Sequence, residues 1–368
     1  MTPVEFRRHL HADPELSFEE HRTARFITAA LEAEGIECRT VAGTGVLAII
    51  EGVQEPHKAV ILRADTDALP INEQTECEWR SRNEGVMHAC GHDVHAATLF
   101  GVLQRIKYCG ALPWTVIALF QPGEECNPGG ALKVLSENPF AGYDVRAVIA
   151  QHVEPNMAVG CFGFCAGKFM AANDELRFTV CGKGGHAAMR PSLKDPVQAA
   201  AELITELLSF NGSDSVVSIG RVQADGATNV IPDSVYLEGT MRTLDEELRR
   251  TIKSGIADVA ARIDARCGTS TSIDINEGYP CVVNDLRLTD MARELAAERF
   301  AAAELPPRAT SEDFGRFCHI YPSLLYRSGA GVNSGGTHTP YFNPDEQAVN
   351  VDVDFMYMLA EKVIAAKF

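Results

Sequence analysis

The chain has 368 residues, of which 46% are hydrophobic and 23% charged, and its formal net charge is -17 at pH 7. This length exceeds that of one ordinary hydrophobic core, so we expect two domains. The composition is typical of a globular protein and argues against a disordered or fibrous one. The excess of acidic residues argues against a nucleic-acid partner and against an anionic membrane surface, because both require concentrated lysine and arginine.

The sequence also bears on the compartment. The first residues, MTPVEFRRHLHADPELSF, lack the apolar core of a signal peptide, and no apolar run approaches the length of a membrane span. The eleven cysteines are scattered and odd in number, which is typical of reduced thiols rather than of a disulfide framework. We therefore expect a cytoplasmic enzyme.

Two helices are predicted at the start of the chain. Thr2 with Glu5 and Ser17 with Glu20 each have the spacing of a capping box, and the second helix should end near Gly35. Apolar runs of strand length and one helical run follow. They predict strands at 46–50, 59–64, 115–120 and 147–153, and a helix at 95–109. This alternation predicts an α/β fold with a mostly parallel sheet.

The pattern changes near residue 165. Strands are predicted at 175–180, 215–223, 234–243 and 271–279, and helices at 195–210 and 245–265. Asp195 with Pro196 starts the first helix, and Thr243 with Glu246 gives the second a capping box. The order strand, helix, two strands, helix, strand is the split-βαβ order of a ferredoxin-like α+β domain.

The α/β pattern returns near residue 281, with a helix at 285–300, a strand at 323–329 and a C-terminal helix. The larger domain is therefore predicted to be discontinuous. It should comprise residues 1–165 and 281–368, interrupted by a smaller domain at 166–280.

Polar side chains follow four of the apolar runs. They are Asp65 with Asp67, Glu124 with Glu125, His152, and, after a glycine-rich loop, His338. In open α/β sheets, sites form beyond the carboxyl ends of the strands, so these side chains should meet at one edge.

The stretch MHACGHDVH, residues 87–95, adds further ligand types. Cys90 and His92 are two residues apart, and Gly91 between them favours a turn in which both side chains converge. His95 belongs to the helix that follows. We interpret the stretch as a ligand-bearing turn at the start of a buried helix.

One thiolate, three imidazoles and several carboxylates exceed what a single tetrahedral ion needs and suffice for two. Zinc accepts such mixed ligands, and manganese, cobalt or nickel can occupy the same groups. Glu124 and Glu125 invite a division of labour in which one binds metal and the other is a general base. Alone, each histidine could be a packed or capping residue, Cys90 a core residue and the glutamates surface residues. Their combination at strand ends favours a metal site.

Nine blocks of the sequence resemble one family in order along nearly the whole chain. They are FRRHLHADPELSFEE, LRADTDALPI, MHACGHDVH, GEE, AQHVEP, GKFMAANDELRFTVCGKGGHAAMRP, TNVIPDSVYLEGTMRT, SEDFGRF and GGTHTPYFNPDE. The family is that of the metal-dependent amidohydrolases and exopeptidases, which includes aminoacylase, hippurate hydrolase, N-acetyl-diaminopimelate deacetylase and plant auxin-conjugate hydrolases. The resemblance implies Glu124 as the general base, and as ligands of two divalent ions Cys90, His92, Glu125, His152 and His338.

The resemblance further implies that the smaller domain is a lid that dimerises. His186 would reach the active site of a neighbouring subunit and stabilise the oxyanion, and Asn229 and Arg242 would bind the substrate carboxylate. From the residues alone, His186 could be an exposed loop histidine and Arg242 a solvated charge. A guanidinium can nevertheless hold a carboxylate with two hydrogen bonds. So acidic a protein needs a local basic residue of this kind to bind an anionic substrate.

We expect Asp65, Asp67 and Asp93 to orient the ligands or to cap the following turn rather than to bind metal. The predicted function is hydrolysis of the amide bond of N-acyl amino acids by a homodimer with two zinc or manganese ions. A metallo-dipeptidase or carboxypeptidase, and a metal-binding scaffold without activity, are the alternatives. The segments CNPGG after GEE and CFGFCA before GKFM depart from the family pattern, so the sequence leaves the acyl group and the amino acid open.

Overall fold

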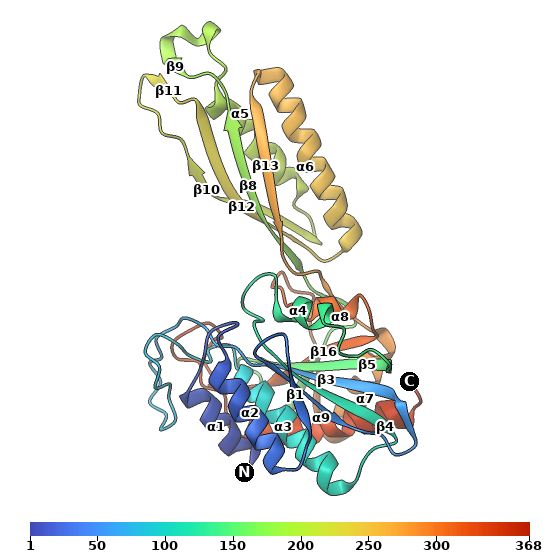
Figure 1. Cartoon of the computed structure of the whole chain (residues 1–368). Helices are drawn as coiled ribbons and strands as arrows, with labels where there is room; N and C mark the ends of the chain where they lie inside the picture. Colours follow the sequence, from blue (N-terminus) through green and yellow to red (C-terminus); the bar gives the residue numbers. More distant parts are fainter. The chain divides into compact units, whose positions relative to one another are not determined.

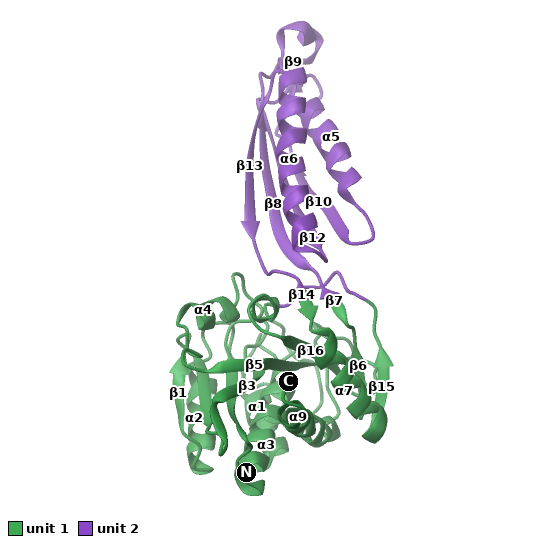
Figure 2. Cartoon of the chain, turned by 90° about the vertical axis from the view of Figure 1, so that its right-hand side faces the viewer, with its two compact units in different colours: residues 1–167, 283–306, 313–368 green, residues 168–282, 307–312 purple.

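The computed structural model describes residues 1–368, which divide into two compact units. The larger unit comprises Met1–Gly167, Val283–Pro306 and Asp313–Phe368. The smaller unit comprises Lys168–Val282 and Pro307–Glu312 (Figure 2). The larger unit is thus built from three separate parts of the chain. No helix in the chain is both long and apolar enough to cross a bilayer.

An eight-stranded sheet forms the centre of the larger unit. Its strands are β1 (Cys38–Val41), β2 (Gly45–Ile50), β3 (Glu55–Asp65), β4 (Trp114–Gln121), β5 (Asp144–Glu154), β6 (Cys161–Phe164), β15 (Ala301–Glu304) and β16 (Ser323–Gly329). Their order is β1-β2-β4-β3-β5-β16-β6-β15. The four central strands, β4 to β16, are parallel, so their carboxyl ends lie at one edge. The expected α/β fold with a mostly parallel sheet is confirmed.

Helices cover this sheet. They are α1 (Pro3–Ala12), α2 (His21–Ala33), α3 (His92–Cys109), α4 (Gly130–Ser136), α7 (Leu286–Arg299), α8 (Gly315–Cys318) and α9 (Gln347–Ala365). Figure 1 shows α1, α2, α3 and α9 on one face and α4 and α8 on the other. Helix α3 is the most deeply buried, and the ring of its Phe100 stacks on Phe6 of α1 at 4.4 Å between centroids. Burial around α3 fixes the position of its first turn.

The smaller unit has one four-stranded antiparallel sheet. Its elements are β8 (Ala172–Cys181), α5 (Pro196–Leu207), β10 (Ser215–Gln223), β12 (Ser234–Thr243), α6 (Glu246–Cys267) and β13 (Ser270–Glu277), and the strand order is β10-β12-β8-β13. Helices α5 and α6 pack against each other and, with one face of the sheet, enclose an apolar core. Two further strands, β9 (Gly185–His186) and β11 (Val230–Ile231), form a small ribbon. The short strands β7 (Gly167–Met170) and β14 (Val282–Asn284) lie where the chain passes between the units.

The helix starts test the capping predictions. The capping box at Thr2 is present. The one at Ser17 is wrong, because its hydroxyl donates to the Asp67 carboxylate at 2.7 Å and α2 begins only at His21. The one at Thr243 is also wrong, because Asp245, a stronger acceptor two residues on, caps α6 instead.

Candidate metal centre

Two histidine side chains meet at the sulfur of Cys90. The Nε2 atom of His152, near the end of β5, lies 3.3 Å from the Cys90 Sγ. The Nε2 atom of His338 lies 3.4 Å from the same sulfur. Cys90 and His152 are buried, whereas His338 comes from the exposed loop after β16. Residues far apart in the sequence thus converge on one thiol.

A second set of contacts extends this cluster. The Oε1 atom of Glu125 lies 3.3 Å from His338 Nε2 and 3.8 Å from His92 Nε2. The ligand atoms of Cys90, His92 and His152 lie within 4.8 Å of one another, and so do those of Cys90, Glu125 and His338. Two three-residue groups of potential metal ligands therefore share Cys90.

The backbone places these ligands through two left-handed residues. Gly91 has φ 88° and precedes His92, the first residue of α3. A Cβ at Gly91 would lie 2.5 Å from a methyl group of Val153, so only glycine fits this turn. His338 has φ 59°, and its N–H donates to the carbonyl of Ala89 at 2.8 Å. That hydrogen bond ties the loop of His338 to the turn of Cys90.

The cluster fits a divalent metal. His92 Nε2 is buried without a hydrogen-bond partner, which is costly unless another group satisfies it. Burial, followed by the negative charge of Glu125, raises the pKa of the Cys90 thiol. Hydrogen bonds to Cys90 and to Glu125 raise the pKa of His338 to about 10. The electron-rich side chains therefore attract positive charge to a place where the Nε2 atom of His92 lacks a partner.

Asp67 orients two residues of the cluster. The Nδ1–H of His92 donates to the Asp67 carbonyl at 2.9 Å and contacts Oδ1 at 3.2 Å. The other carboxylate oxygen accepts from the backbone N–H of Glu125 at 2.9 Å and from the Ser17 hydroxyl. A proton on Nδ1 leaves the Nε2 lone pair of His92 directed into the cluster.

Asp93 is held by helix α1. Its Oδ2 accepts from Arg7 Nε at 2.9 Å and lies 3.0 Å from His11 Nδ1. Burial opposes a charge on His11, but Asp93 and then Glu73 stabilise it and raise its pKa to about 9. Sequence reasoning missed Arg7 and His11. The sequence feature that could have revealed them is the placement of two polar residues, four apart, on the buried face of an amphipathic helix.

Glu124 precedes Glu125 in the turn after β4 and is buried, with 6% of its surface exposed. This turn is fixed by Gly123, which has φ 62° and donates its N–H to the Glu20 carboxylate at 2.8 Å. The turn therefore places two glutamates side by side. Glu125 lies close to His92 and His338, and Glu124 is enclosed by protein.

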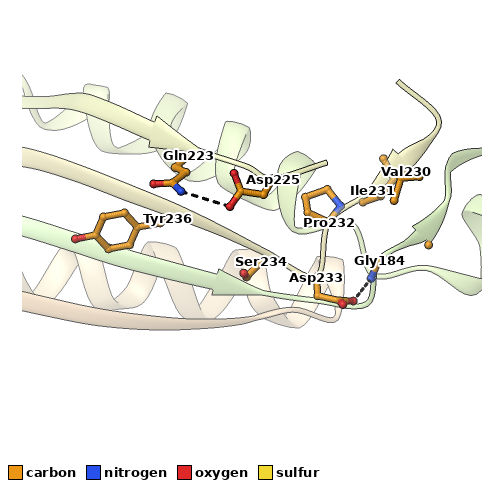
Figure 3. Close-up of a pocket in the computed structure, with 10 residues that line it drawn as sticks. Gly184, Gln223, Asp225, Val230, Ile231, Pro232, Asp233, Ser234 and Tyr236 are labelled. Carbon is orange, nitrogen blue, oxygen red and sulfur yellow. Dashed lines mark hydrogen bonds between the residues drawn. The ribbon is translucent and has the colours of Figure 1, made fainter. Parts of the chain in front are cut away.

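The remaining predicted site residues belong to the smaller unit. His186 in β9 pairs with Val230 in β11, which brings Asn229 and His186 onto the same ribbon. The N–H of Ala188 donates to His186 Nδ1 at 3.2 Å, and both His186 and Asn229 are exposed. A pocket of about 570 Å³ lies beside this ribbon, and Figure 3 shows Asp233 at its wall, accepting from the Gly184 N–H at 2.8 Å.

Arg242 lies elsewhere, near the end of β12. Its guanidinium is partly buried and donates to the hydroxyl groups of Thr240 at 3.2 Å and Ser311 at 2.9 Å. Burial lowers its pKa, and the nearby charge of Asp174 partly offsets this effect. Arg242 has no ion pair with a carboxylate, so its charge is positioned but not neutralised.

Comparison with known proteins decides the family. Residues 61–362 match peptidase family M20/M25/M40, which is more than half of the chain. The protein belongs to this family. Among its relatives is N-acetyl-L-cysteine deacetylase of Bacillus subtilis, which is 36% identical over 98% of this chain and 88% of the relative. N-acetyldiaminopimelate deacetylase of Anoxybacillus flavithermus is 35% identical over 96% of this chain and 95% of the relative.

Solved structures agree with the M20 assignment. A dinuclear metal-binding M20 peptidase from Bacillus subtilis superposes with a TM-score of 0.88, at 36% identity, over 99% of this chain and 98% of that one. An aminohydrolase from methicillin-resistant Staphylococcus aureus, whose function is itself inferred, gives a TM-score of 0.89 at 31% identity, over 98% and 96% of the two chains. The fold is thus shared with M20 relatives of known structure, one of which is a dinuclear metal-binding peptidase.

Proposed function

We propose that this M20 protein is a metal-dependent hydrolase that cleaves the amide bond of N-acyl amino acids, releasing a carboxylic acid and a free amino acid. The observation that carries the proposal is the pair of three-residue groups joined at Cys90, with a buried glutamate beside them. Full-length relatives that bear the names of N-acyl amino acid deacetylases support the choice of substrate class.

Cys90, His92, Glu125, His152 and His338 are the proposed ligands of two divalent ions, with zinc or manganese as the first candidates and cobalt or nickel next. Such ions, when bound, supply a Lewis acid for the amide carbonyl and make nearby water more acidic. The protein contributes a shaped and largely buried site that holds the ligands apart from bulk solvent.

Glu124 is the proposed general base. It accepts a proton from the attacking water and passes it to the nitrogen of the departing amino acid. Its neighbour Glu125 is directed to the histidines by the hydrogen bond from its own N–H to Asp67, which separates the two roles. Burial of Glu124 keeps the transferred proton away from bulk solvent.

The smaller unit is proposed to be a ferredoxin-like lid that also forms a homodimer and provides the contacts to the substrate carboxylate. Arg242 suits this role because its half-buried guanidinium is held by hydroxyl groups alone. Asn229 and His186 share one exposed ribbon, so both are available to a substrate or to a second copy of the chain. In neutral His186, acceptance at Nδ1 leaves a proton on Nε2 for an oxyanion.

The test is a substrate panel of N-acetyl amino acids, N-benzoyl amino acids and dipeptides, assayed with added zinc or manganese. We expect turnover of at least one N-acyl class, and a preference for dipeptides would favour the peptidase alternative. Glu124→Gln should lower kcat by about 10²-fold to 10⁴-fold while metal content stays at two ions per chain. Glu19→Gln, an exposed change of the same kind, is the control and should leave both quantities unchanged.

A further inference from the structure

His95 lies between the two buried imidazoles of the cluster but does not join them. It is fully buried in the first turn of α3, three residues after His92. Its ring centroid lies 5.5 Å from that of His92 and 4.9 Å from that of His152. A third histidine at this place would be expected to be another metal ligand.

Both nitrogens of His95 are already engaged. Nδ1 lies 2.5 Å from Oδ1 of Asp65, and Nε2 accepts the backbone N–H of Val153 at 2.9 Å. Because Nε2 accepts, the proton of the neutral ring is on Nδ1 and is donated to Asp65. Neither nitrogen retains a lone pair for a metal ion, so His95 acts on its neighbours.

The bond to Val153 takes the place of a missing strand. β3 pairs with β5 only as far as Arg63 and Ala150, whereas β5 continues to Glu154. Beyond that point β5 has β16 on one side and no strand on the other. An unpaired buried N–H would be costly there, and His95 Nε2 satisfies it one residue after His152.

Asp65 anchors the ring from the other side. Its second carboxylate oxygen accepts from Arg63 at 2.8 Å, and Arg63 donates to Asp313 at 2.8 Å. The N–H of Ala131, at the start of α4, also donates to Asp313 at 2.9 Å. All of these side chains are buried in the larger unit. His95 is therefore held by a rigid network of charges and not by apolar packing alone.

We infer that His95 is a positioning residue of the metal centre, which fixes the end of β5 through Val153 and thereby sets the place of His152 relative to His92. The inference rests on the metal centre proposed above. Outer contacts of this kind affect metal affinity by about 10-fold to 100-fold when they are removed.

Two substitutions separate this role from packing. In His95→Gln the side-chain oxygen can occupy the Nε2 position and still accept the Val153 N–H. In His95→Asn the amide nitrogen can occupy the Nδ1 position and donate to Asp65, but the acceptor for Val153 is lost. His57→Asn, at an exposed histidine in β3, controls for the loss of an imidazole.

Metal affinity of each full-length apo protein is measured by competition with a chelator, using Zn²⁺ and Co²⁺. We expect His95→Asn to lower the affinity for one of the two ions by about 10-fold or more and to alter the Co²⁺ absorption spectrum. His95→Gln should lose less affinity than His95→Asn. Equal affinities in the two variants, whether both weak or both normal, would overturn the inference. A wild-type chain that binds neither ion would overturn the metal centre itself, and the inference with it.

Discussion

Asp67→Asn is the sharpest test of how the metal ligands are held. The Asp67 carboxylate faces only donors: His92 Nδ1 at one oxygen, and the Glu125 N–H and the Ser17 hydroxyl at the other. Asparagine has nearly the same shape but only one acceptor. Whichever way its amide turns, an NH₂ group faces either His92 or the Glu125 N–H.

The size of the effect follows from the bond that is lost. A hydrogen bond to a charged group contributes about 1.5–3 kcal/mol. Since about 1.4 kcal/mol corresponds to a factor of ten in an equilibrium constant, metal affinity should fall by about 10-fold to 100-fold. The backbone carbonyl of Asp67 still accepts from His92 at 2.9 Å, so binding should weaken rather than disappear.

The assay is chelator competition on the apo protein, with thermal unfolding of the apo form measured in parallel. Ser17→Ala is the matched control, because it removes the third donor to Asp67 and leaves both ligand contacts in place. We expect the control to bind metal as the wild type does. An Asp67→Asn protein with wild-type affinity would refute the idea that this carboxylate orients His92 and Glu125.

Three further outcomes are expected. Arg242→Ala should raise KM for carboxylate substrates by about 10-fold or more with little change in kcat. Arg221→Ala, which breaks an exposed ion pair between β10 and β12, should leave KM unchanged. An unchanged KM in Arg242→Ala would remove Arg242 from the substrate site. Burial raises the pKa of Asp352 from 3.8 to about 8, so the folded state keeps a proton that the unfolded state releases. Between those pH values Asp352 should contribute a fall of about 1.4 kcal/mol per pH unit to the free energy of unfolding. Asp352→Asn should remove this contribution from the pH dependence measured in urea titrations, and a pH dependence equal to that of the wild type would contradict the assignment. Exhaustive chelation should abolish turnover, which zinc or manganese should restore; turnover that persists in metal-free protein would exclude a metal-dependent reaction.

The sequence predicted the long elements well because their patterns are strong. The observed bounds of β10, β12 and β16 are the predicted ones, 215–223, 234–243 and 323–329. Strands β6 and β15, of four residues each, were not predicted, because so short a segment carries no periodic signal. Helix α4 was missed for a similar reason, since it is short and begins at the second glycine of a glycine pair.

The candidate site was predictable where its residues follow strands. The carboxyl ends of parallel strands share one edge, which is why Glu125 and His152 could be expected to meet. Their supports could not be found in this way. Arg7 and His11 reach Asp93 from a helix more than eighty residues earlier, and nothing in either local sequence specifies the pairing. Such contacts depend on tertiary packing.

The interrupted path of the larger unit has a consequence for biosynthesis. β16 inserts between β5 and β6, yet it is translated after the whole contiguous segment Lys168–Val282 of the smaller unit. A nascent chain that has emerged to that point contains Cys90, His92, Glu125 and His152, but neither the strand that completes the sheet nor His338. The smaller unit can fold during translation, whereas the larger unit can complete its fold only when nearly all of the chain has been synthesised. The proposed metal centre therefore lacks its ligand His338 until synthesis is almost finished.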